Sequence, residues 1–540
     1  MRLLSTLRRP ATYVAAAGLT LAMVGGSAAA HGAVKRAIPN GGTATVTFQS
    51  DFNTLDPALS TDVYSNSVIH ALFVNLVEFE PGGKIVPWAA SSWTVAPNGL
   101  TYTFHIKPGI QFTDGEPVNA QAFAYGIERV LNPATKSPGS NYFLDVVGAP
   151  QFAAGKAKTV SGISTPNAST IVFHLIKPER VFIDYVGLQY GDAVPAKAVT
   201  KEGANFAHQP VGDGPFMLQT WVPGQKLVIV KNPKYFDKAQ AAHLNSVVFQ
   251  IGGQSEVSLL KAEQGQVDVL GDLIPPADFA SVDSNPKWKP YVNLDPIAAD
   301  EFIYFDEGKA PFNNMDVREA AYWAIDQSRI LQLVAGQGAP TGQIIPPGVP
   351  GHDSSIPNTF KQNVALAKQL LVKAGYKAGT GPAATFWVFN TAPGPVLAQA
   401  IQQELDQVGF KITIKSVPFS TLVSQITQIP NVQFGIIGWV SQYPDPVSSI
   451  SSMFETARIK AGTDLADYNN AAVNAQLVKA DALAINKAVP LYEAAQKTIL
   501  SNYPWVPLYN QVEANFVNPR LGGFSQDDSY WFDYANWYIK

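Results

Sequence analysis

Residues 386–439, FWVFNTAPGPVLAQAIQQELDQVGFKITIKSVPFSTLVSQITQIPNVQFGIIGW, decide the fold class. Three short segments within them have the apolar, β-branched and aromatic content of strands, and two longer segments repeat apolar residues at helical spacing. We expect the strands at 386–389, 411–417 and 433–439, and the helices at 396–408 and 421–429. Gly409 is expected to end the first helix, because glycine adopts the left-handed conformation that follows many helices. This order of elements favours a parallel sheet built by right-handed crossovers, so we predict an α/β fold.

The rest of the chain mixes strand-like and helix-like segments and has no short internal repeat. Further strands are expected at 43–48, 100–106, 170–175, 226–231 and 245–251, with further helices at 118–130 and from the last of these strands through Gln264. Residues 313–336 predict one helix, with Asp316 as its N-cap, Glu319 completing a capping box and Gly336 closing its C-terminal end. Another helix is expected to end at Gly375.

The segment GWVSQYPDP, residues 438–446, follows the last strand of the decisive stretch. Ligands of open α/β sheets bind outside the carboxyl ends of the strands, which makes this loop the candidate ligand loop. Pro444 and Pro446 fix the backbone at two positions and so lower the entropy lost on binding. The alternative is a tight turn that packs Trp439 and Tyr443 into the core, and the local sequence does not separate the two interpretations.

Composition indicates a globular protein with an export signal. Of 540 residues, 46% are hydrophobic and 15% are charged, which fits about three globular domains. Residues 1–30 contain three arginines, then an apolar run too short to span a bilayer, then small residues. This pattern predicts a signal peptide cleaved after Ala30, with an uncleaved anchor as the alternative. We therefore expect a periplasmic or extracellular protein.

Charge and residue usage exclude several classes of function. Without the three arginines of residues 1–30, 35 basic residues stand against 42 acidic ones, which argues against a nucleic-acid partner. The chain has no cysteine, which excludes disulfides, zinc–thiolate sites and a lipid anchor through cysteine. Its seven histidines form no ligand pair, so we expect no metal site and no cofactor. Neither a Gly-x-Ser-x-Gly motif nor a phosphate-loop lysine is present, so no enzyme is indicated.

Several blocks of sequence, taken in order, carry a family resemblance. They are NTLDPALS (53–60), residues 76–133, 212–237 and 303–326, PPGVPG (346–351), GWVSQYPDP (438–446) and residues 506–524. In this order they resemble the extracellular solute-binding proteins of the oligopeptide/dipeptide/nickel family, which supply ABC importers. The resemblance covers nearly all of the chain after residue 30.

The resemblance implies a two-lobed fold of the periplasmic-binding-protein type, with an additional α+β domain on lobe I. Two strands join the lobes, which close over the ligand. By this analogy, lobe I comprises residues 31–66, 196–293 and 506–540, the extra domain comprises 67–195, and lobe II comprises 294–505.

The resemblance also implies the ligand-binding residues. In peptide-binding members, an Asp after the Gly-Trp pair binds the α-ammonium of the peptide, and the matching position here is Gln442. An amide accepts a hydrogen bond but supplies no countercharge for a buried ammonium. Asp445 and Asp51 are the candidate substitutes. Together the implied ligand-binding residues are Asp51, Asn53, Phe419, Gly438, Trp439, Gln442, Tyr443 and Asp445.

The other end of the ligand is altered as well. Where some peptide binders place Arg or His to meet the carboxylate of the peptide, this chain has Pro395, Ile426 and Ile436. The cleft therefore keeps its aromatic walls and loses charge at both ends. Two interpretations remain open: a peptide held mainly by backbone pairing, or a neutral or differently charged solute such as a blocked peptide, a saccharide or a metal chelate.

The sequence thus predicts a monomeric substrate-binding protein that captures oligopeptides or peptide-like solutes and passes them to ABC permease subunits without chemistry. The rival class is a hydrolase or sensor on the same scaffold.

Overall fold

The computed structural model describes residues 38–80, 83–426, 432–457, 464–525 and 532–540. The expected signal segment, residues 1–30, lies outside the described residues. Within the described ranges, no helix combines the length and apolar character needed to cross a membrane.

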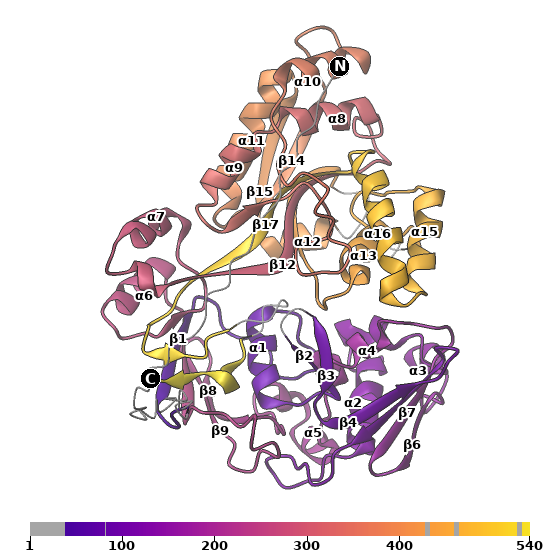
Figure 1. Ribbon diagram of the computed structural model, residues 1–540, viewed down its shortest axis with the longest axis vertical. Coiled ribbons are helices and arrows are strands. Elements are labelled where there is room, and N and C mark those ends of the chain that lie inside the picture. The colour runs from indigo at the N-terminus through magenta and orange to yellow at the C-terminus, as the bar shows by residue number, and fades with distance from the viewer. Residues whose placement is uncertain (1–37, 81–82, 427–431, 458–463, 526–531) are drawn as a thin grey trace, which may run out of the picture. The chain divides into compact units, whose positions relative to one another are not determined.

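Three sheets organise residues 39–540 (Figure 1). The five-stranded sheet has the order β11-β1-β10-β9-β8, with β1 Thr43–Phe48, β8 Phe216–Val222, β9 Lys226–Lys231, β10 Ser246–Ile251 and β11 Val269–Leu270. The four-stranded sheet has the order β4-β5-β7-β6, with β4 Ala90–Val95, β5 Thr101–Ile106, β6 Ile163–Asn167 and β7 Thr170–His174. Two small pairs add β2 Val77–Glu80 with β3 Lys84–Pro87, and β18 Leu521–Gly522 with β19 Tyr538–Ile539.

The six-stranded sheet contains the decisive stretch. Its order is β13-β17-β12-β16-β14-β15, with β12 Val292–Phe305, β13 Gly338–Pro340, β14 Ala383–Phe389, β15 Lys411–Val417, β16 Phe434–Val440 and β17 Trp505–Phe516. Strand β14 runs parallel to both β15 and β16, which confirms the predicted parallel unit. Strands β12 and β17 run antiparallel from Val292 and Phe516 to Tyr304 and Trp505, with register shifts on either side of Asp300 and Glu301.

Helices cover both faces of this sheet (Figure 1). One face packs against α8 Met315–Ala324, α9 Gln327–Leu333, α10 Val364–Lys373 and α11 Gly394–Val408. The other packs against α12 Phe419–Ile426, α13 Ser452–Phe454, α15 Ala471–Asp481 and α16 Ile485–Leu500. The apolar cluster on that second face continues into the four-stranded sheet and its helices, through residues such as Tyr185 and Tyr443.

The remaining helices lie on the other two sheets. They are α1 Val63–Leu72, α2 Ala120–Leu131, α3 Ala149–Ala153, α4 Phe182–Tyr185, α5 Ala196–Glu202, α6 Ser255–Glu263 and α7 Pro276–Ser284. The C-terminal residues Tyr534 and Trp537 are buried with Val46 and Phe48 of the five-stranded sheet.

Most predicted elements are confirmed within two residues at each end. Strand β14 begins three residues earlier than predicted, and residues 427–429 of the helix predicted at 421–429 lie outside the described residues. Gly409 ends α11 with φ +120, as its position predicted. The single helix predicted over residues 313–336 is wrong. The chain forms two helices there, because Ile325 is extended and buried, and Asp326 then caps α9. The N-cap of α8 is Asn314, whose side chain accepts a hydrogen bond from the Asp316 N–H.

Candidate functional site

Strand β16 delivers the loop 438–446 at its carboxyl end. Gly438 and Trp439 pair across the antiparallel ladder with Glu301 and Asp300 of β12. The register continues past the strand, because the Ser441 N–H donates to the Ala298 carbonyl at 2.8 Å. A Cβ at 438 would lie 2.6 Å from Glu301 Oε2 and 2.7 Å from Gln511 Nε2, so a larger residue there would displace the ends of both side chains. The first part of the loop is therefore held by the sheet itself.

The two aromatic residues of the loop differ in burial. Trp439 is half-buried, and its indole Nε1–H donates to the Ser448 carbonyl at 2.7 Å. Tyr443 is buried, and its ring meets that of Tyr185 edge-on, with the centroids 5.6 Å apart. The packed-turn interpretation thus describes Tyr443 well, whereas Trp439 keeps part of its surface open.

Gln442, the residue predicted to occupy the ammonium-binding position of the family, is exposed. Its Oε1 accepts a hydrogen bond from the Tyr142 hydroxyl, and its backbone N–H donates to Ser448 Oγ at 2.8 Å. Tyr142 belongs to the segment around the four-stranded sheet, where its ring stacks on Tyr190. The amide oxygen of Gln442 therefore already has a protein partner in this structure.

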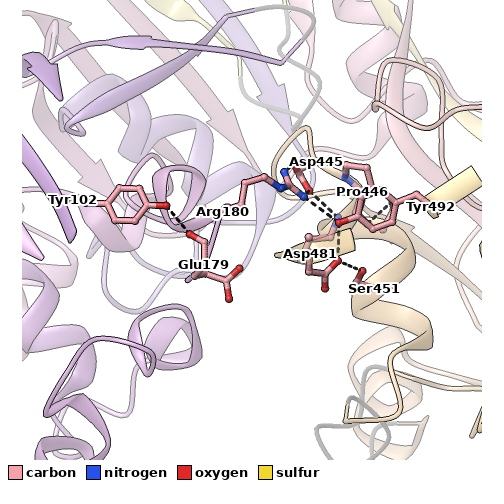
Figure 2. Close-up of polar contacts among 10 residues, drawn as sticks. Tyr102, Glu179, Arg180, Asp445, Pro446, Ser451, Asp481 and Tyr492 are labelled. Carbon is pink, nitrogen blue, oxygen red and sulfur yellow. Dashed lines mark hydrogen bonds and ion pairs between the residues drawn. The ribbon is translucent and has the colours of Figure 1, made fainter. Parts of the chain in front are cut away.

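Asp445 is buried and bound to Arg180 (Figure 2). Arg180 uses both terminal nitrogens, with Nη2 2.9 Å from Asp445 Oδ1, and Nη2 also donates to the Tyr492 hydroxyl at 3.0 Å. Burial lowers the pKa of the guanidinium, but the hydrogen bond and charge of Asp445 outweigh burial and raise the pKa overall. This carboxylate is neutralised within the protein.

The polar network continues from Tyr492 to Asp481 and Ser451 (Figure 2). The Tyr492 hydroxyl donates to Asp481 Oδ1 at 2.6 Å, and Ser451 Oγ donates to the same oxygen at 2.8 Å. Burial raises the pKa of Asp481 to about 6. Helix α15, helix α16 and the loop are therefore joined by one chain of hydrogen bonds that passes through Arg180.

Asp51 and Asn53, the two predicted ligand-binding residues that follow β1 of the five-stranded sheet, also have protein partners. Asp51 Oδ1 accepts from Trp221 Nε1 at 3.0 Å and Oδ2 from the Gly224 N–H at 2.6 Å. Asn53 donates from Nδ2 to Asp62 at 3.1 Å. Phe419 opens helix α12, but its side chain lies outside the described residues. Ligand contact by these three residues and by those of the loop stays a prediction.

Sequence reasoning missed Tyr142, Arg180 and Tyr185, which contact the loop from the segment around the four-stranded sheet. Arg180 lies 265 positions from Asp445 in the chain, and nothing in its local sequence, IKPERVF, marks it as a partner of the loop. No periodicity or motif could have identified such a contact.

Sequence reasoning also missed two adjacent buried carboxyl groups on β12. Asp300 accepts from Asn510 Nδ2, and Glu301 accepts from Gln511 Nε2 at 3.1 Å. Burial raises the pKa of Asp300 well above its ordinary value and that of Glu301 to about 7. Both amide partners lie on β17, so these pairs tie the two long strands together beside the loop.

Glu301 provides a test of this electrostatic setting. Its pKa is higher in the folded than in the unfolded chain, so the charged form costs stability above about pH 7, and this cost disappears as the pH falls below the unfolded value near 4.5. We expect Glu301→Gln to raise the free energy of unfolding by on the order of 3 kcal/mol near pH 8 and to change little near pH 4. Urea titrations at both pH values measure this difference. The exposed Glu256→Gln is the control, and an equal effect of both variants at both pH values would contradict the burial argument.

Among the described residues, no group of three or more His, Asp or Glu side chains is placed to hold a metal ion.

Comparison with known proteins assigns the fold and the family. Residues 84–461 match the model of bacterial extracellular solute-binding proteins, family 5 Middle. The chain is 27% identical to the probable deoxycholate-binding periplasmic protein YgiS of Escherichia coli, over 88% of this chain and 89% of that protein. It is 26% identical to the periplasmic oligopeptide-binding protein OppA of Salmonella typhimurium, over 95% of each chain. The murein tripeptide binding protein MppA of Escherichia coli shares the fold, with a TM-score of 0.78 and 23% identity over 93% of this chain and 99% of that one.

The family model covers well over half of the chain, and the blocks quoted from the sequence fall largely within it. The chain therefore belongs to the bacterial extracellular solute-binding proteins of family 5, the non-catalytic substrate-binding components of ABC importers.

Proposed function

We propose that the protein captures a peptide-like solute outside the cytoplasm and delivers it to the membrane subunits of an ABC importer. The proposed site lies between lobe I (31–66, 196–293 and 506–540, with 67–195 as its extra domain) and lobe II (294–505). The supporting observation is the position of the loop 438–446. It leaves the carboxyl end of β16 with half-buried Trp439 and exposed Gln442, and it meets Tyr142 from segment 67–195.

The proposed binding mode does not depend on a charge at the amino end of the solute. The three positions considered for an ammonium partner are Gln442, Asp445 and Asp51, and each has oxygens engaged within the protein. A peptide would then be held by backbone hydrogen bonds and aromatic contact, as in strand addition. Electrostatic preference for a free amine would be weak.

A second candidate is a neutral solute that is not a peptide. The engagement of Gln442, Asp445 and Asp51 within the protein favours it as well, because a buried ligand charge without a partner is costly. Relatives of the chain carry names that specify different ligands, including deoxycholate, glutathione and heme. Family membership therefore leaves the ligand class open.

Mass spectrometry of solute retained after mild purification tests the proposed function. An intact peptide or blocked peptide supports the first candidate, and a non-peptide solute supports the second. Turnover of a panel of peptides and glycosides by the purified protein would contradict both. The mass of the protein secreted by cells also tests the export proposal, in which the mature chain begins at His31 and carries no lipid.

Charge at position 442 provides a direct test of the binding mode. We expect Gln442→Asp to raise affinity for short peptides with a free amino end by about tenfold, because a carboxylate makes a charge-assisted hydrogen bond with the ammonium. N-acetylated versions of the same peptides should bind the variant no more tightly than they bind the wild type. Calorimetry with both peptide sets measures this, and unchanged affinity throughout would mean that residue 442 does not face the amino end.

A further inference from the structure

The contact between Arg180 and Asp445 joins two parts of the chain that are organised around different sheets. Arg180 follows β7 of the four-stranded sheet and lies two residues before α4, whereas Asp445 follows β16 of the six-stranded sheet. Only 18% of the Arg180 side chain and 9% of the Asp445 side chain are exposed. The pair is therefore a largely desolvated ion pair rather than a surface contact.

The geometry of the pair is specific. The two terminal nitrogens of Arg180 meet the two oxygens of Asp445 in a fork, an arrangement that lysine cannot reproduce. Asp445 Oδ1 also accepts from the Val447 N–H at 3.0 Å, so the same carboxylate caps the turn that follows the loop. Arg180 thus acts on the shape of the loop through Asp445.

Three further contacts connect the same two parts of the chain. The Tyr142 hydroxyl donates to Gln442, and the Tyr185 ring meets the Tyr443 ring edge-on. Gly83, between β2 and β3, lies so close to Pro444 that a Cβ there would be 2.5 Å from the Pro444 Cβ. Every loop residue from 442 to 445 therefore has a partner from segment 67–195.

A buried ion pair contributes to the arrangement only while both partners remain together. If segment 67–195 moved away from the loop, Arg180 and Asp445 would regain water, and the cap on residue 447 would lose its neutralising partner. The strands β12 and β17, which connect the two lobes in the proposed division, offer the hinge for such a movement.

We propose that Arg180 is a positioning residue that locks the loop 438–446 in its binding shape when the lobes close, so that closure and completion of the ligand site are one event. The proposal rests on the lobe division given above but not on the identity of the solute. A solute bound by the loop would favour the closed form only through contacts that are better in the closed form than in the open form. The Arg180–Asp445 pair sets the ratio of closed to open molecules before any solute binds.

The test measures the distance between two spin labels in protein stripped of solute. Because the chain has no cysteine, labels can be placed at Lys156→Cys and Lys487→Cys, two exposed positions in segment 67–195 and in α16. The labelled protein with Arg180 and Asp445 intact should give a short-distance population. Arg180→Gln should reduce the ratio of short to long distances by about tenfold or more, and Asp445→Asn should do the same.

Two further variants separate positioning from folding. Arg180→Lys keeps the charge without the fork and should restore part of the short-distance population. The double variant Arg180→Gln/Asp445→Asn should show no more effect than either single variant, because the two residues act as one pair. Lys197→Gln, which removes a charge from a pair whose lysine side chain is 86% exposed, is the matched control and should leave the distances unchanged.

Either of two results would overturn the proposal: only long distances in the unmodified protein, or the same distances after Arg180→Gln as before. Neither result would bear on solute capture, which the retained-solute experiment measures separately. If Arg180→Gln lowers the thermal midpoint strongly, Arg180→Lys and Asp445→Asn provide the comparison.

Discussion

Replacing Trp439 with alanine is expected to weaken binding of the retained solute by about 2 kcal/mol or more, close to a thirtyfold loss of affinity. The indole is half-buried at the start of the loop and has two functions there. Its open surface offers an aromatic wall to a solute, and its Nε1–H holds the Ser448 carbonyl at 2.7 Å. Alanine removes both the contact area and the bond that fixes the turn.

Calorimetry with the solute identified by mass spectrometry measures the effect. Trp93→Ala is the matched control, because Trp93 is also half-buried but lies on β4, opposite Phe104 and away from the loop. A loss of affinity confined to Trp439→Ala supports the assignment of the loop to the ligand site. Equal affinity in the wild type and the Trp439 variant would remove that assignment. The affinity of Trp439→Phe should lie between those of the wild type and Trp439→Ala, since phenylalanine keeps a ring but lacks the N–H donor.

Removing the carboxylate of Asp56 is expected to cost about 3–5 kcal/mol of stability, the largest effect predicted for this protein. Asp56, in the NTLDPALS block, is 2% exposed and forms a forked ion pair with Arg129 of α2, with Nη1 at 2.6 Å. Its Oδ1 also accepts the Ala58 N–H at 3.0 Å. Asp56→Ala leaves the partly buried guanidinium of Arg129 without its counterion and leaves the turn without its acceptor.

Urea unfolding followed by tryptophan fluorescence and by circular dichroism measures this cost, provided that the two signals change together. Glu80→Gln is the control, because the Lys84–Glu80 pair has exposed fractions of 71% and 48% and such pairs contribute less than about 1 kcal/mol. A loss for Asp56→Ala no larger than that of the control would show that the buried pair is not needed. Because Asp56 follows β1 of the five-stranded sheet and Arg129 lies in segment 67–195, the pair also connects that segment to the chain beside this sheet.

Local patterns were sufficient for the elements around the loop. The alternation of Ile412 and Ile414 marks β15, the apolar run ending at Trp439 marks β16, and Gly409 ends α11 because its backbone is left-handed. The prediction of a single helix over residues 313–336 was wrong, and the reason is also local. Its apolar spacing was maintained through Ile325, but burial of Ile325 and capping by Asp326 divided it in two.

The α/β unit, the family and the loop that follows β16 could all be predicted from the chain, because each depends on spacing within a few dozen residues or on the order of blocks along it. The partners of the predicted site residues, in contrast, are visible only in the folded chain. Asp445 meets Arg180 and Asp51 meets Trp221 across 265 and 170 positions. Hydrogen bonds and ion pairs act over a few ångströms in space, and the packing of separate sheets, rather than any local period, brings these side chains within that range.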